Sequence, residues 1–245
     1  MCLPRNRAAD AKKNEVKPWL TQEWCIPPDH SGDFVAHMED VLEVYTLPFD
    51  PQRPQVCMDE LSKQMIEEIR TPVAAKPGQP ERYDSEYVRK GVANLFIFFE
   101  PLAGRREIRV TKRRTMLDWA EAVRELADVH YPAADKIVLV MDNLNTHSIG
   151  SLYEAFPPAE AQRIARKLEI HYTPKHGSWL NMAESELSIL ARQCLKRRIP
   201  DMEQLDKEVS AWKAERNQAL CPMRWRFTTA KARNRLARLY PSLEA

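Results

Sequence analysis

Apolar and polar positions along the first half of the chain predict one helix and three strands. Residues 34–45 place apolar side chains at helical spacing and predict a short helix. Three strand candidates follow at 55–60, 93–99 and 107–111; the first ends in two acids, and a turn at Gly104 separates the other two. Together the three strands predict an antiparallel meander.

The second half of the chain alternates helical and strand patterns. Thr115 and Asp118 have capping-box spacing and predict the start of a helix. Residues 137–141 form a continuous apolar run, which is typical of a central strand buried on both faces. A helical stretch is then expected to end near residue 167, and a strand follows at 169–173. Three helices are expected last: one beginning near 181, one at 201–218 and one at 228–239.

This order of elements predicts an α/β fold, in which a mixed sheet is flanked by helices and extra helices follow at the C-terminus. We divide the chain into three parts. Residues 1–45 form an N-terminal linker and short helix, residues 46–200 form the sheet domain, and residues 201–245 form a C-terminal helical extension.

The composition is that of an ordinary soluble globular protein, with 44% hydrophobic and 29% charged residues. Apolar runs such as 137–141 are too short to span a bilayer, and the N-terminus has no apolar signal segment. Five scattered cysteines without a CxxC pair favour reduced thiols in the cytosol: Cys2, Cys25, Cys57, Cys194 and Cys221.

Positive charge is concentrated toward the C-terminus. From Leu187 onward there are 13 Lys/Arg residues against 6 Asp/Glu residues, whereas the net charge of the chain is only +2. A second basic run extends from Arg105 to Arg114 and comprises Arg105, Arg106, Arg109, Lys112, Arg113 and Arg114. Both segments are interpreted either as solvated faces or as contacts to a phosphate backbone.

Acidic residues stand where the predicted strands leave the core. Asp59 and Asp142 each follow an apolar strand, and α/β sheets place their sites at such strand ends. Each acid taken alone also has an ordinary explanation as a turn residue. A third acid is expected from the helix beginning near Asn181, where Glu184 and Glu186 flank the apolar stripe and geometry favours Glu184 only slightly. The spacing of Asn181 and Glu184 also fits a capping box.

Three motifs in order then identify a resemblance. The stretches VCMDE (56–60), VLVMDNLNTHS (138–148) and HYTPKHGSWLNMAESELSIL (171–190) resemble the acidic motifs of DDE transposases. More narrowly, they are similar to the bacterial insertion-sequence branch of the mariner-like superfamily. Flanking stretches match too: WCIPP (24–28), FVAHMEDVLEVY (34–45) and WRFTTAKARNRLARLYP (225–241). The resemblance covers nearly everything from about Lys17 to the end.

The resemblance implies an RNase H-like catalytic domain in residues 46–200, with Asp59, Asp142 and Glu184 as catalytic residues and metal ligands. It selects Asp59 over Glu60 and Glu184 over Glu186. Two Mg²⁺ or Mn²⁺ ions would serve cleavage and transfer of a 3′-hydroxyl end. The implied partners are transposon-end and target DNA and further copies of the chain, in the bacterial cytoplasm at the nucleoid, with no membrane. Four other motif residues are interpreted as positioning groups or as ordinary loop and cap residues: Asn143, His147, Lys175 and Asn181.

Other interpretations stay open beside this one. The family carries an N-terminal DNA-binding region that we do not expect in residues 1–45. The chain is therefore also interpretable as an idle remnant that binds DNA or full-length transposase, or as a plain RNase H-like nuclease. A zinc site formed by Asp142, His147, His171 and His176 is disfavoured, because their spacing matches no zinc pattern.

Overall fold

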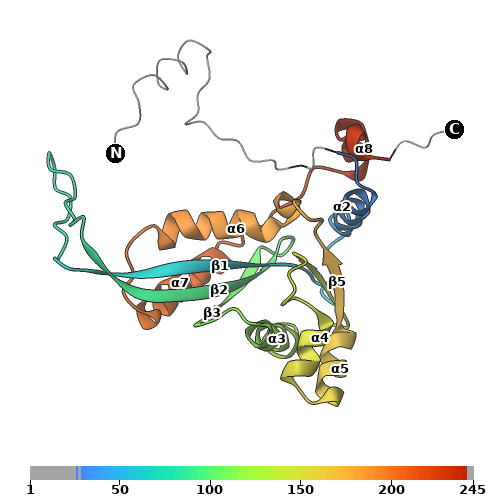
Figure 1. Cartoon of the computed structure of the whole chain (residues 1–245), viewed down its shortest axis with the longest axis horizontal. Helices are drawn as coiled ribbons and strands as arrows, with labels where there is room; N and C mark the ends of the chain where they lie inside the picture. The colour runs from blue at the N-terminus through green and yellow to red at the C-terminus, as the bar shows by residue number, and fades with distance from the viewer. Residues whose placement is uncertain (1–25, 27–28, 242–245) are drawn as a thin grey trace, which may run out of the picture.

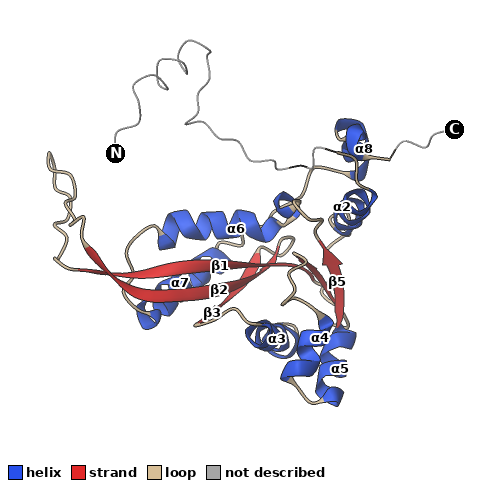
Figure 2. Ribbon diagram, viewed as in Figure 1, coloured by secondary structure: helices blue, strands red, loops and turns tan. Residues whose placement is uncertain are grey.

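The computed structural model describes residues 26 and 29–241, and its centre is one mixed five-stranded sheet with helices on both faces (Figure 1, Figure 2). Across the sheet the strands run in the order β3-β2-β1-β4-β5. Their bounds are β1 (Gln55–Glu68), β2 (Tyr87–Glu100), β3 (Arg105–Thr111), β4 (Ile137–Met141) and β5 (Leu168–Tyr172). The first three strands pair antiparallel, and β4 and β5 run parallel to β1. The predicted fold class and the predicted meander are confirmed.

Seven α-helices lie in the described part of the chain. They are α2 (Gly32–Val44), α3 (Met116–Glu125), α4 (Ile149–Ala155), α5 (Pro158–Lys167), α6 (Met182–Leu190), α7 (Met202–Gln218) and α8 (Thr229–Arg235). Helix α3 begins with the predicted capping box: the Asp118 amide donates to the Thr115 hydroxyl, and the Thr115 amide donates to the Asp118 carboxylate. Short π-helical segments follow α3 and α6, at Leu126–His130 and Ala191–Leu195.

The sheet separates two hydrophobic cores, because successive strand residues point to opposite faces. On one face, α2, α6, α7 and α8 pack against strand residues that include Cys57, Ile97 and Phe99. On the other face, α3, α4 and α5 pack against strand residues that include Met58 and Phe98. Figure 1 shows α6 and α3 on opposite sides of the sheet.

Strand β1 is longer than the pattern predicts, so the expectation that it ends at Glu60 is wrong. It continues to Glu68 because β2 stays paired with it along most of that length. Its parallel pairing with β4, by contrast, runs only from Gln55 to Cys57. Asp59 therefore lies inside β1, two residues beyond the last β4 pair, rather than at the end of a strand.

Two expected helical stretches are divided. The stretch after Asp142 forms two helices, α4 and α5, separated at Phe156 and Pro157, where the extended backbone of both residues ends the first helix. The last expected helix ends at Arg235 and is followed by a short 3₁₀ turn at Ala237–Leu239.

Part of the sequence-based interpretation falls outside the described residues. This applies to the proposed linker before Ile26 and to Cys2 and Cys25. The cysteines that the structure does describe, Cys57, Cys194 and Cys221, are free thiols. Across the described residues, every helix is too short or too polar to cross a membrane.

Candidate active site

The alternation of β1 places its two adjacent acids on opposite faces of the sheet. Cys57 belongs to the core beneath α6 and Met58 to the core beneath α3. Asp59, two residues after Cys57, therefore faces α6, whereas Glu60 faces the α3 side. The Glu60 amide donates to Asp59 Oδ1 at 2.7 Å, which fixes the Asp59 carboxylate against its own strand.

The beginning of α6 is attached to β1 beside Asp59. Asn181 is the N-cap of α6; its side-chain oxygen accepts from the Ala183 amide, and its Nδ2 donates to the Met58 carbonyl at 2.8 Å. The Tyr45 hydroxyl donates to the carbonyl of Leu180 at 2.7 Å and supports the same turn. Two elements that are distant in sequence thus meet one residue before Asp59.

Glu184 lies in the first turn of α6 and is half-buried. The capping box suggested by its spacing from Asn181 does not form, because the Asn181 amide donates to the Ser178 carbonyl at 2.7 Å instead. The Glu184 carboxylate is therefore not used to cap its own helix, and its charge acts on Asp59.

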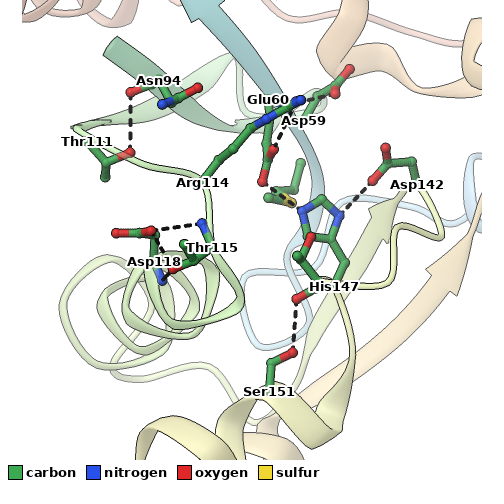
Figure 3. Close-up of polar contacts among 12 residues, drawn as sticks. Asp59, Glu60, Asn94, Thr111, Arg114, Thr115, Asp118, Asp142, His147 and Ser151 are labelled. Atoms are coloured by element: carbon green, nitrogen blue, oxygen red, sulfur yellow. Dashed lines mark hydrogen bonds and ion pairs between the residues drawn. The ribbon is translucent and has the colours of Figure 1, made fainter. Parts of the chain in front are cut away.

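Asp142 follows β4 and is held by a histidine (Figure 3). His147 Nδ1 lies 2.7 Å from Asp142 Oδ1, and His147 Nε2 lies 2.8 Å from Glu60 Oε1. The imidazole therefore connects the acid after β4 to an acid on β1. His147 lies within one of the three sequence motifs, but its contact with Glu60 is not apparent from the sequence.

The surroundings of His147 keep its imidazole charged. Its side chain is fully buried and stacks on Trp119 at 5.9 Å between ring centroids. Burial alone would lower the pKa of His147, but hydrogen bonds to Asp142 and Glu60 outweigh it and raise the pKa to about 9. A cationic imidazole between two carboxylates fixes the orientation of Asp142 and leaves its Oδ2 for another ligand.

Asp59 has no neighbouring cation, and the hydrogen bond from the Glu60 amide only partly offsets the burial of its carboxylate. Burial first, and then the charges of Asp142 and Glu184, raise the pKa of Asp59 to about 7. Within the described residues, no Lys or Arg forms an ion pair with Asp59 or Glu184. A carboxylate whose pKa is raised by burial and by neighbouring acids is common at functional sites.

These carboxylates fit a hard divalent cation by chemistry and charge. In the described part of the chain, no three His, Cys, Asp or Glu side chains are gathered closely enough to hold one ion together. Mg²⁺ does not need such a cage, since it usually takes one or two carboxylates, several waters and substrate phosphates. A cavity of about 910 Å³ beside Asp142 gives access from solvent, and its lining includes Asn143, Lys175 and His176.

Glu186, the rival acid in the sequence, is excluded from this arrangement. It is 1% exposed and pairs with Arg106 and Arg216 on the far side of α6. Arg106 is itself fully buried, so the interpretation of the whole 105–114 run as a solvated or DNA-facing surface is wrong at that residue. Lys112, Arg113 and Arg114 are exposed.

The histidines considered for zinc are separated. His147 contacts Asp142, whereas the Nδ1 of His171 lies 2.8 Å from Asp40 on α2. His176 lines the cavity near Asp142 in a left-handed backbone conformation, with φ of 63°.

Comparisons with known proteins agree with this architecture. A family model described as DDE superfamily endonuclease matches residues 54–206. None of the curated proteins matches the chain.

Among solved structures, the chain is similar to the Mos1 transposase paired-end complex with the left transposon end, at 13% identity and a TM-score of 0.54. That match covers 88% of this chain and 67% of the Mos1 chain. The mariner Mos1 paired-end complex with Mg matches at 17% identity and a TM-score of 0.53, covering 91% and 69%. The pre-cleavage Mos1 transpososome matches at 14% identity and a TM-score of 0.51, covering 98% and 72%.

At these identities the solved structures establish the fold, which is the RNase H-like arrangement of the Mos1 catalytic domain. The family match establishes more, because it spans over half of the chain and includes Asp59, Asp142 and Glu184. The chain belongs to the DDE superfamily of endonucleases.

Proposed function

We propose that this chain is the catalytic domain of a DNA transposase of the bacterial insertion-sequence branch of the mariner-like superfamily. It would cleave phosphodiester bonds at the element ends and join the 3′-hydroxyl strand to target DNA. Residues 46–200 would form the catalytic domain, with residues 201–245 as a helical extension. The observation that carries the proposal is the attachment of the first turn of α6, which carries Glu184, to β1 beside Asp59. The charges of Asp142 and Glu184 act on Asp59 there, and no Lys or Arg of the described residues pairs with Asp59 or Glu184.

Asp59, Asp142 and Glu184 would hold two Mg²⁺ or Mn²⁺ ions. Bound ions of this kind supply Lewis acidity that stabilises the attacking and leaving oxygens of a phosphodiester. Asp59 and Glu184 offer carboxylates from a strand and a helix that Asn181 holds together. His147 keeps Asp142 in one orientation by donating to its Oδ1.

Exposed cations lie on both sides of these acids and suit a DNA strand. Arg114 is 59% exposed at its side chain and lies 3.8 Å from Glu60 (Figure 3). Lys175 lines the cavity beside Asp142. Contacts of this kind bind phosphate without reading sequence, so DNA affinity should fall steeply with salt. Synapsis of two element ends would require at least a dimer.

The test measures nicking of supercoiled plasmid DNA by the purified chain with Mg²⁺, Mn²⁺ or Ca²⁺. We expect nicking with Mg²⁺ and Mn²⁺, and its abolition in Asp59→Asn, Asp142→Asn and Glu184→Gln. Glu154→Gln, at an exposed acid on α4, is the matched control and should retain activity. Retained nicking in any of the three variants would remove that residue from the catalytic set.

A second assay separates transposase from plain nuclease. An oligonucleotide duplex carrying a free 3′-hydroxyl end is incubated with plasmid and Mn²⁺, and covalent joining is measured. Joined product supports strand transfer, whereas nicking without joining would favour a plain nuclease of the same fold.

A further inference from the structure

A charged residue occupies the buried face of α6, where an apolar residue is expected. Met182, Ala183, Leu187 and Leu190 face the core, and Glu186 lies among them with 1% of its surface exposed. Its Oε2 lies 3.1 Å from Arg106 Nε, and its Oε1 accepts from Arg216 Nη2 at 2.8 Å. Burying a carboxylate is costly unless it is paired and hydrogen-bonded, so this contact is a specific feature of the fold.

Arg106 anchors this contact to three other segments. Its guanidinium donates to the carbonyls of Gly104, Arg216 and Cys221 at 2.9, 3.0 and 3.1 Å. It also lies over the Phe99 ring at 5.0 Å. The side chain of Asn217 accepts from the Arg106 amide and donates to the Arg106 carbonyl, each at 2.9 Å. The arginine is therefore held by β2, β3 and the end of α7, and it cannot follow α6 if the helix turns.

Helix α6 has a second fixed point at its N-terminus. Asn181 donates to the Met58 carbonyl on β1, next to Asp59. The attachments at Asn181 and Glu186 are more than one helical turn apart, since a turn takes 3.6 residues. Two attachments at different heights and directions fix both the position and the rotation of a helix.

The rotation decides where Glu184 points. Residues two positions apart on a helix are separated by about 200° around its axis. Glu186 contacts Arg106 on β3 from the buried face of α6, so Glu184 lies on the other side of the helix, where it is half-buried. In the sheet order β3-β2-β1-β4-β5, that other side is the side of β4, which Asp142 follows.

We infer that Glu186 and Arg106 are positioning residues that hold α6 in the rotation that directs Glu184 toward Asp59 and Asp142. This inference rests on the proposed function, because it requires Glu184 to be a metal ligand. It also assigns a role to the end of α7: Arg216 and Asn217 stabilise the anchor from outside the sheet domain. Glu184 and Glu186 thus lie two residues apart on α6 but face opposite sides of the sheet, Glu184 the side of β4 and Glu186 the side of β3.

The test measures Mn²⁺ binding to the full chain directly, using the electron paramagnetic resonance signal of free Mn²⁺ as the readout. Thermal unfolding of the same variants is measured in parallel. Glu186→Gln should weaken Mn²⁺ affinity about tenfold or more, as is usual for residues that orient a ligand. Glu184→Gln should weaken it at least as much. If Glu184→Gln binds Mn²⁺ as tightly as the unaltered chain, Glu184 is not a metal ligand and the proposed function is wrong at that residue. If Glu184→Gln binds weakly but Glu186→Gln binds as tightly as the unaltered chain, only the positioning role of Glu186 is overturned.

A stability control separates positioning from general loosening. Ile164 is fully buried on α5, on the opposite face of the sheet, and Ile164→Ala should lower the Tm by removing core volume. We expect Ile164→Ala to retain the original Mn²⁺ affinity. Equal weakening in Ile164→Ala and Glu186→Gln at a similar loss of Tm would overturn the inference.

The double variant Arg106→Met with Glu186→Leu covers the case in which Glu186→Gln folds poorly. Replacing a buried ion pair by apolar side chains often retains or raises stability, whereas breaking it does not. We expect the double variant to bind Mn²⁺ as weakly as Glu186→Gln. A double variant with the original affinity would show that packing alone positions Glu184.

Discussion

At the level of single residues, the contacts of His147 show how a buried positive charge is stabilised. Its imidazole is hydrogen-bonded on both nitrogens to carboxylates and stacked on Trp119. Each carboxylate comes from a different strand, Glu60 from β1 and Asp142 from the end of β4. Removing the cation would leave two acids facing each other across a buried space.

We expect His147→Ala to lower the free energy of unfolding by about 1.5–3 kcal/mol at pH 6.5, since its hydrogen bonds join charged groups. The folded pKa of about 9 exceeds the ordinary value of 6.5. This contribution is therefore fully present below pH 6.5 and is lost as the pH rises through 9. Urea unfolding of metal-free protein between pH 6 and 9.5 should show this fall, and His147→Ala should lack it.

His171→Ala is the matched control for that series. His171 also contacts two carboxylates, those of Asp40 and Glu169, but it lies on β5 and outside the acid site. The variant should retain the fall in stability above pH 6.5. An unchanged pH profile in His147→Ala would contradict the assignment of a charged imidazole.

At the level of elements, the turn between β2 and β3 packs closely against the segment that follows α7. Gly104 adopts φ of 65°, and a Cβ there would lie 2.7 Å from the backbone of both Cys221 and Pro222. The amide of Met223 donates to the carbonyl of Pro101 in the same turn. Only glycine allows this approach, so the turn and the chain after α7 hold each other in place.

Gly104→Ala should therefore lower the free energy of unfolding by more than the backbone strain of the residue alone would. Gly78→Ala is the control, because Gly78 has φ of 77° but no atom within 4 Å of the added Cβ. We expect Gly78→Ala to lower the free energy of unfolding by about 1 kcal/mol. Gly104→Ala should lower it by at least about 1 kcal/mol more, because the crowded backbone must shift. Equal losses in chemical denaturation would mean that the contact with Cys221 is easily relaxed.

Elements determined by local pattern were predictable from the sequence. The apolar run of β4 and the Thr115–Asp118 capping box are read from a few adjacent residues, and both are confirmed. The length of β1 was not predictable, because residues 61–68 are mostly polar and form strand only through pairing with β2. The breaks after α4 and α8 were missed for a related reason: a helical pattern alone does not mark where tertiary packing ends a helix.

The candidate site was only partly predictable. Asp59, Asp142 and Glu184 came from motif resemblance, and as metal ligands they remain a prediction. The contacts of Glu60 with His147 and of Arg106 with Glu186 join residues 87 and 80 positions apart, which no local pattern reveals. One signal was available: Arg106 and Glu186 each put a charge at a position where its element otherwise has apolar residues.

At the level of the whole molecule, the acid site lies where the two cores meet across the sheet. Asp59 faces the α6 side and Glu184 lies on α6, whereas Glu60 faces the α3 side and His147 stacks on Trp119 of α3. The site is therefore sensitive to the packing of both layers. The charges of Asp142 and Glu184 disfavour the ionised form of Asp59 in the metal-free fold, and a bound divalent cation would offset this effect.

Asp59 should accordingly contribute a loss of stability to the metal-free protein as the pH rises from about 4 to about 7. The pKa of Asp59 is raised in the fold to about 7 from an ordinary value of 3.8. In that window the folded chain binds more protons than the unfolded chain, so the free energy of unfolding falls with pH. Asp59→Asn should flatten the profile and raise the Tm at pH 7 in chelator, and Mn²⁺ should raise the Tm of the unaltered chain only.

Glu154→Gln provides the control for this profile, because that acid is exposed on α4. It should reproduce the decline of the unaltered chain. A decline of the same slope in Asp59→Asn would show that the acid site does not cause it.

The side-chain amide of Asn217 has a consequence for the edge of the sheet. Strand β3 is one of the two edge strands, and such strands present free N–H and C=O groups that can recruit strands from other molecules. By satisfying both backbone groups of Arg106, Asn217 imitates a neighbouring strand for one residue, and α7 covers the same strand. The side chain of Asn217, which also holds Arg106 in place, thus leaves neither backbone group of that residue free for a strand of another molecule.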